Sequence, residues 1–252
     1  MATYLSKLEN PYPAKKRGSA VVRFGVIGFG YWGPNVVRNL SQLENADVLG
    51  VCDTNPVARK RLHKAHPQIA VASDPAHLIS SPDVDAIAVI TPVWTHYELA
   101  KAALENGKHV FVEKPLCVDE AELNRVAESY AASGRILSVG FNRRFSPFAR
   151  ECRDFFAGRH EPLSILYRVN AGRLPAGHWI YDPAQGHGRV IGEVCHFVDL
   201  VGFLASSPSD VIDSKPQSRK IAIVACSITQ LKLWGATTDH ALGCAGVSPV
   251  KA

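Results

Sequence analysis

A glycine-rich hexapeptide constrains the fold of this chain more tightly than any other feature. Residues 28–33 read GFGYWG, follow a short apolar run over 21–27 and precede a helical pattern that begins at Pro34. This is the strand, turn and helix context that a G-x-G-x-x-G fingerprint requires. Gly28 then permits a tight turn, Gly30 lets the backbone approach a pyrophosphate, and Gly33 allows close packing of helix on strand. A turn of purely structural use is the alternative. We expect the whole turn to contact a dinucleotide, namely Gly28, Phe29, Gly30, Tyr31, Trp32 and Gly33.

An acidic residue stands where such a turn needs one. Asp53 lies twenty residues after Gly33 and directly follows a second apolar run over 47–52. An acidic side chain at this place accepts hydrogen bonds from the adenosine ribose. Since Asp53 would repel a 2′-phosphate and the next two residues carry no cation, we expect NAD rather than NADP. The nearby Arg59, Lys60 and Arg61 are expected to be solvated residues of a helix.

The rest of the first half alternates between apolar runs and amphipathic stretches, which is typical of a parallel sheet covered by helices. Continuous Val/Ile runs indicate strands buried on both faces. The expected strands are 21–27, 47–52, 69–72, 86–90, 110–112 and 136–139, and the expected helices are 34–43, 56–66, 75–80, 95–106 and 120–133. Residues 21–142 therefore make one doubly wound α/β domain of the Rossmann type.

Prolines and caps mark several helix ends. Pro34 and Pro56 stand where a first helical turn begins, since the missing N–H costs little there. Thr95 is expected to cap its helix, with Glu98 completing a capping box. Gly107 is expected to end that helix in the left-handed conformation.

The second half of the chain has a different pattern of expected helices and strands. We expect a flexible arm over 1–20, and beyond Phe141 a helix over 147–158, a half-exposed strand over 162–170, a helix over 194–204 and one or two strands over 221–234. Residues 143–252 make up the expected second domain, which serves substrate binding or oligomerisation.

Composition excludes several classes of protein. The chain has 252 residues, 46% of them hydrophobic and 20% charged, as in ordinary globular proteins. No apolar run is long enough for a transmembrane helix, and the scattered net charge of +5 does not favour nucleic acid. Six cysteines without a C-x-x-C pair suggest neither a metal site nor a disulfide scaffold. We expect a cytoplasmic protein with no metal, no membrane and no nucleic-acid partner.

Two further loops lie at the carboxyl ends of expected strands, where doubly wound folds bind ligands. Thr91, Pro92 and His96 follow the fourth strand, and Glu113 and Lys114 follow the fifth. We expect these five residues to contact the cofactor. A lysine at the mouth of a partly buried cleft can also move a proton near neutral pH. A surface lysine paired with Glu113 is the alternative.

Together these motifs resemble the glucose–fructose oxidoreductase / inositol dehydrogenase (Gfo/Idh/MocA) family. The resemblance extends to GFNRRFSP over 140–147 and GRVIGEVCHFVDL over 188–200, so it covers residues 22–204. It implies an N-terminal Rossmann domain followed by an α+β domain with an open, mostly antiparallel sheet. Family members are longer, so we expect this second domain to be shortened.

The resemblance also assigns roles to residues. Lys114 matches the family's EKP lysine beside the reacting hydroxyl, Pro115 matches the proline of that loop, and His196 matches the histidine of an active-site helix. Many members carry an aspartate four residues before that histidine, where this chain has Gly192. Its neighbour Glu193 points about 100° away on a helix. The expected catalytic residues are Lys114 and His196.

The substrate side is less specific. Asp199, one turn after His196, could orient the imidazole or be an ordinary residue of an amphipathic helix. The expected substrate residues are Asn142, Arg143, Arg144, Glu193, His196 and Asp199, with His178 as a further candidate. Arginines there suit a phosphate or carboxylate, or else form a solvated basic loop.

The resemblance implies an NAD(P)-dependent oxidoreductase that acts on a hydroxyl of a sugar, cyclitol or nucleotide-sugar. The alternative is a catalytically silent NAD(P)-binding protein with a regulatory or assembly role. The family's open sheet commonly forms an interface, so we expect a homo-oligomer.

Overall fold

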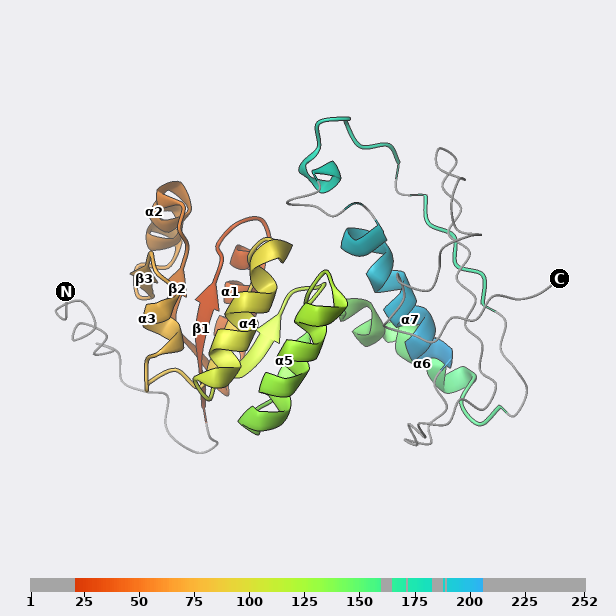
Figure 1. The fold of residues 1–252 in the computed structure, drawn as a ribbon, viewed down its shortest axis with the longest axis horizontal. Helices are drawn as coiled ribbons and strands as arrows, with labels where there is room; N and C mark the ends of the chain where they lie inside the picture. The colour runs from red at the N-terminus through yellow and green to blue at the C-terminus, as the bar shows by residue number, and fades with distance from the viewer. Residues whose placement is uncertain (1–20, 160–164, 171, 183–187, 189, 206–252) are drawn as a thin grey trace. The chain divides into compact units, whose positions relative to one another are not determined.

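The computed structural model describes residues 21–159, 165–170, 172–182, 188 and 190–205 (Figure 1). Two compact units share them: the first contains 21–141 with the described part of 174–195, and the second contains the described parts of 142–173 and 196–205. The arm expected over 1–20 and the strands expected over 221–234 lie outside the described residues. The functional domains expected over 21–142 and 143–252 stay predictions.

A six-stranded parallel sheet forms the centre of the first unit. Its strands are β1 (Val22–Ile27), β2 (Ala46–Cys52), β3 (Ala70–Ala72), β4 (Ala86–Val89), β5 (His109–Val112) and β6 (Leu137–Val139). They lie in the order β3-β2-β1-β4-β5-β6, and each neighbouring pair is parallel. The strand order reverses between β1 and β4, the place where doubly wound folds bind their ligands. The expected doubly wound α/β fold is confirmed.

Five helices connect these strands. They are α1 (Gly33–Gln42), α2 (Pro56–Ala65), α3 (Ala76–Ile79), α4 (His96–Glu105) and α5 (Glu120–Ser133), with a short 3₁₀ helix, η2 (Val93–Thr95), before α4. Asn55 and Asp119 cap α2 and α5, because their side chains accept the backbone N–H of Val57 and Glu122. Gly107 is left-handed, as expected.

The capping box expected at Thr95 is wrong. Its hydroxyl makes no bond to an N–H of α4. It donates instead to the carbonyl oxygen of Pro92 and lies 2.7 Å from the Thr91 hydroxyl. Because η2 leads directly into α4, the Thr95 side chain turns back toward the preceding loop.

The core has two layers because successive strand residues point to opposite faces of the sheet. Val26, Val51 and Ala88 pack with α1 and α2, whereas Ile27 and Val89, each one residue later, pack with α3, α4 and α5. Figure 1 draws α4 and α5 in front of the strands. Helices cover both faces of the sheet, and the carboxyl ends of its strands carry the expected site.

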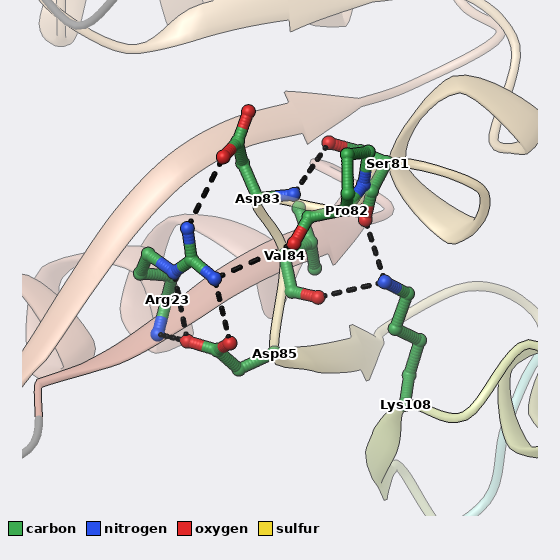
Figure 2. Close-up of polar contacts among 7 residues, drawn as sticks. All are labelled: Arg23, Ser81, Pro82, Asp83, Val84, Asp85 and Lys108. Carbon is green, nitrogen blue, oxygen red and sulfur yellow. Dashed lines mark hydrogen bonds and ion pairs between the residues drawn. The ribbon is translucent and has the colours of Figure 1, made fainter.

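Charged residues tie the strands together at the opposite end of the sheet (Figure 2). The Arg23 guanidinium donates to both oxygens of Asp85, at 3.0 and 2.9 Å, and the Arg23 N–H donates to the same carboxylate at 2.9 Å. The buried Lys108 ammonium donates to the carbonyl oxygens of Ser81 and Val84. These bonds hold the segment before β4 between the start of β1 and the residue that precedes β5.

We expect this network to make the folded state sensitive to acid. Hydrogen bonds from Arg23 hold the pKa of Asp85 below its usual range, so the carboxylate stabilises the fold above about pH 4 and loses that effect as the pH falls. Arg23→Gln should lower the free energy of unfolding by about 1–2 kcal/mol at neutral pH, since the pair is partly exposed. In urea titrations the gap between parent and variant should narrow below about pH 4. A gap that does not change with pH would contradict this assignment.

The described part of the second unit contains the helix α6 (Pro147–Phe155), a 3₁₀ turn, η3 (Asn142–Phe145), and all but the first residue of the helix α7 (Cys195–Ala205). Two shorter helical segments, η4 (Trp179–Tyr181) and η5 (Val190–Val194), lie before α7 in the chain and belong to the first unit. The strand expected over 162–170 is not formed over its described part, 165–170. Without a neighbouring strand among the described residues, the alternating pattern there has nothing to pair with.

Candidate functional site

The glycine turn is shaped by contacts that only glycine permits. Gly28 has φ +105°, and a Cβ on it would lie 2.4 Å from the carbonyl oxygen of Ile90. A Cβ on Gly33 would lie 2.4 Å from the Gly28 carbonyl oxygen. At Gly30, by contrast, a Cβ would meet no described atom within 4 Å. Gly28 and Gly33 therefore let the turn fold, whereas Gly30 borders open space that a bound group can fill.

Asp53 completes this turn from the end of β2. One carboxylate oxygen accepts the N–H of Phe29 at 2.7 Å, and the other accepts the N–H of Asn55 at 2.8 Å. Each oxygen keeps further acceptor capacity, because a carboxylate offers about four lone-pair positions. The arrangement holds Asp53 beside the turn with room to accept a ribose hydroxyl.

Two arginines that were expected in solvent bind this region. Arg59 donates to the carbonyl oxygens of Asp53 and Thr54, both at 2.8 Å. Arg61 donates to the carbonyl oxygens of Phe29 and Gly30. Both arginines lie on α2, and their spacing along that helix carried no signal that Arg59 binds the end of β2 or that Arg61 reaches the glycine turn.

The three aromatic positions of the turn differ in exposure. The Phe29 side chain is buried in the core beneath α1 and α2, so only its backbone is available to a ligand. Tyr31 and Trp32 are 86% and 54% exposed and meet edge to face, with ring centroids 5.3 Å apart. The expected contact of Phe29 with a cofactor stays a prediction, and this burial restricts it to the Phe29 backbone.

His96 ties the other two loops together. Its ring is 2% exposed, with Nδ1 2.7 Å from the carbonyl oxygen of Pro115 and Nε2 2.8 Å from that of Thr91. Burial lowers the pKa of His96, while the two carbonyl oxygens raise it and the charge of Lys114 lowers it further. The ring is therefore built into the backbone of the site and is not aimed outward at a cofactor.

Lys114 is half-buried in the loop after β5, where the Lys114–Pro115 peptide bond is cis. Its ammonium donates to the carbonyl oxygen of Gly192 at 2.5 Å. The Glu113 carboxylate instead accepts the backbone N–H of Lys114, at 3.4 Å. Burial raises the pKa of Glu113, and this effect outweighs the lowering by the hydrogen bond and the charge of Lys114. Among the described residues the Lys114 ammonium forms no ion pair with Glu113, so the surface-pair alternative does not fit.

The first unit thus brings the expected cofactor positions to one edge of its sheet. The glycine turn follows β1, Asp53 follows β2, Thr91 and Pro92 follow β4, and Lys114 follows β5. Since these strands are parallel, their carboxyl ends lie at the same edge. His178 belongs to the same unit, and its Nδ1 accepts the N–H of Ile180 at 3.2 Å.

The expected substrate residues divide between the units. Glu193 lies in η5 of the first unit, whereas Asn142, Arg143 and Arg144 lie in η3 and His196 and Asp199 in α7. Asp199 is 9% exposed and accepts a bidentate pair of bonds from Arg144. Both oxygens of Asp199 therefore already bind Arg144. That Asp199 orients the imidazole of His196 stays a prediction.

Arg143 is also engaged within the second unit. Its guanidinium lies 4.9 Å from the centroid of the Phe197 ring, which stacks on Tyr167. Arg144 and Arg153 both lie over the ring of Phe203. The two arginines of η3 therefore attach this turn to α7, which accounts for their position without a bound anion.

The strand order, the glycine turn and Asp53 define the class: a dinucleotide-binding domain of the Rossmann type. The profile of the Gfo/Idh/MocA oxidoreductases, described as an oxidoreductase family with an NAD-binding Rossmann fold, matches residues 22–141. Residues 22–141 therefore form an NAD-binding domain of the kind found in the Gfo/Idh/MocA family.

Relatives agree with this assignment. The chain is 38% identical over 127 residues to a myo-inositol 2-dehydrogenase of Thermotoga maritima, a match of 49% of this chain and 37% of that protein. It is 40% identical over 189 residues to an inositol 2-dehydrogenase of Acidothermus cellulolyticus, covering 73% of this chain and 53% of that protein. An NAD-binding protein from Listeria innocua has a similar structure, with a TM-score of 0.61, 26% identity and coverage of 73% and 54%.

The chain spans about half the length, or less, of these three relatives. In the part that the structure describes, every helix is too short or too polar to cross a bilayer. The described residues also contain no cluster of three His, Cys, Asp or Glu side chains arranged to hold a metal ion.

Proposed function

We propose that this chain is an NAD-dependent oxidoreductase that acts on a secondary hydroxyl of a cyclitol or a sugar. One observation carries the proposal: the half-buried Lys114 follows β5 at the sheet edge where the glycine turn and Asp53 meet. The two relatives named as inositol dehydrogenases support the substrate class. Residues 21–142 would bind the dinucleotide, and residues 143–252 would contribute to substrate binding.

The residues at this edge suit NAD. The open space beside Gly30 accepts a group that a Cβ would displace, and Asp53 offers oxygens to ribose hydroxyls while repelling a 2′-phosphate. Gly28, Tyr31, Trp32 and Gly33 would surround the diphosphate, and Thr91, Pro92, Glu113 and Lys114 would lie toward the nicotinamide. Phe29 and His96 would contribute to cofactor binding indirectly, because their buried side chains hold the backbone of the loops in place.

The reaction moves a hydride and a proton. When bound, the nicotinamide exchanges the hydride with the carbinol carbon of the substrate. The unprotonated amine of Lys114 would take the hydroxyl proton during oxidation, and the ammonium so formed would return it during reduction. Alcohol and NAD⁺ then balance against ketone, NADH and a proton. His196 would polarise the substrate oxygen, with Glu193, Asn142, Arg143, Arg144 and Asp199 forming or supporting the substrate side.

A direct test combines binding and turnover. NADH should quench the fluorescence of the chain, because Trp32 and Trp94 are exposed in the loops at this edge. The chain should then reduce NAD⁺ with at least one of myo-inositol, scyllo-inositol or a set of common sugars. Binding without turnover across the set would favour the silent NAD(P)-binding protein. Light scattering and cell fractionation would test the homo-oligomeric state and the cytoplasmic location that we propose.

Cofactor preference depends on Asp53. Asp53→Ala should weaken NADH binding by roughly 1–3 kcal/mol, since a charged acceptor is lost, and should narrow the preference for NADH over NADPH. Asp47→Ala makes the same change near the other end of β2 and should leave both affinities unchanged. If Asp53→Ala binds the two cofactors as the parent does, Asp53 does not contact the ribose.

A further inference from the structure

The side chain of Arg61 reaches from α2 to the glycine turn, more than thirty residues earlier in the chain. Its Nη2 donates to the carbonyl oxygens of Phe29 and Gly30, the second at 2.9 Å. The guanidinium also lies 5.3 Å from the centroid of the buried Phe29 ring. Arg61 therefore contacts two consecutive peptide groups of the turn and the one side chain that anchors the turn in the core.

These contacts orient backbone N–H groups. In a planar trans peptide the carbonyl oxygen of one residue and the N–H of the next point in opposite directions. Because Arg61 binds the carbonyl oxygens of Phe29 and Gly30, it turns the N–H groups of Gly30 and Tyr31 away from α2. Among the described residues neither of these two N–H groups has a hydrogen-bond acceptor, and a Cβ on Gly30 would meet no described atom within 4 Å.

Asp53 completes the arrangement from the other direction. It accepts the N–H of Phe29, the residue before the two outward N–H groups. The Phe29 amide is thus satisfied within the protein, while the next two amides face open space with a cation bound behind them. This pattern suits an anion of more than one oxygen, because two adjacent donors point to the same side.

We propose that Arg61 is a positioning residue for the diphosphate of the cofactor, acting through the N–H groups of Gly30 and Tyr31. The inference rests on the proposed binding of NAD and adds a residue outside the G-x-G-x-x-G turn. Arg61 itself touches the turn on the side opposite to the diphosphate. Its loss would let the two peptide groups rotate, which weakens the phosphate contacts and leaves the adenosine contacts of Asp53 in place.

The test separates phosphate binding from adenosine binding. The full chain, Arg61→Ala, Arg61→Lys and Lys60→Ala are titrated with NADH, ADP-ribose and adenosine. Lys60 is the exposed neighbour on α2 and controls for the loss of one positive charge. Arg61→Ala should raise the Kd for NADH and ADP-ribose by about tenfold, the effect of one charge-assisted hydrogen bond, and leave the Kd for adenosine unchanged.

Arg61→Lys should lie between the parent and Arg61→Ala, and Lys60→Ala should match the parent. Equal losses for adenosine and ADP-ribose would overturn the inference, because they would show a general defect of the fold. Unchanged affinity for ADP-ribose in Arg61→Ala would overturn it as well. A parent that binds neither NADH nor ADP-ribose would refute the proposed function itself, and the positioning role with it.

Discussion

Lys114→Met should lower turnover by about two to four orders of magnitude and leave NADH binding close to that of the parent. Methionine keeps similar bulk and removes the amino group that is proposed to move the proton. The glycine turn and Asp53, which are proposed to hold the other end of the cofactor, do not contact Lys114. Steady-state kinetics on the substrate that the parent turns over, together with NADH titration, measure both quantities. The pH–rate profile should also lose one limb.

Two further variants distinguish proton transfer from a structural role. The Lys114 ammonium also donates to the Gly192 carbonyl oxygen, so its loss alone can disturb the loop. Lys114→Arg keeps a donor and a positive charge but cannot release a proton near neutral pH, and it should therefore be as inactive as Lys114→Met. Lys101→Met, on the surface of α4, should be fully active. Substantial turnover in Lys114→Arg would show that the lysine only holds the loop.

Gly30→Val should abolish measurable NADH binding, raising the Kd by roughly a hundredfold or more, without unfolding the chain. A side chain at Gly30 meets no described atom within 4 Å, so the fold has room for it. The same side chain would fill the space beside the outward N–H groups, where the diphosphate is proposed to bind. Fluorescence titration measures the affinity, and thermal melting measures the stability.

Gly28→Ala provides the contrast. Its Cβ would lie 2.4 Å from the Ile90 carbonyl oxygen on a backbone with φ +105°, so this variant should lose stability as well as binding. The two variants should therefore differ in stability: Gly30→Val stays folded without binding NADH, and Gly28→Ala melts at a lower temperature than the parent. NADH affinity equal to that of the parent in a folded Gly30→Val would remove the dinucleotide site from this turn.

Sequence patterns were sufficient for the Rossmann sheet because the forces that select it are local or repetitive. Continuous apolar runs between helical stretches predicted all six strands, and Pro34, Pro56 and Gly107 marked helix ends correctly. The prediction at Thr95 failed, since a capping box depends on the path of the chain before the helix. Here that path is the 3₁₀ helix η2, which the residue pattern did not reveal.

The sequence by itself determined the glycine turn, Asp53 and the EKP loop, because their chemistry depends on residue type and spacing along one strand–turn–helix unit. Only the tertiary structure decided which residues support them. Arg61 binds the glycine turn, and His96 lies between the carbonyl oxygens of Thr91 and Pro115. Lys114 donates to the carbonyl oxygen of Gly192. Arg61 and Lys114 meet groups dozens of residues away, and His96 joins two loops that follow different strands. Such contacts depend on how segments distant in the sequence come together in the fold, and no local pattern of side chains encodes that.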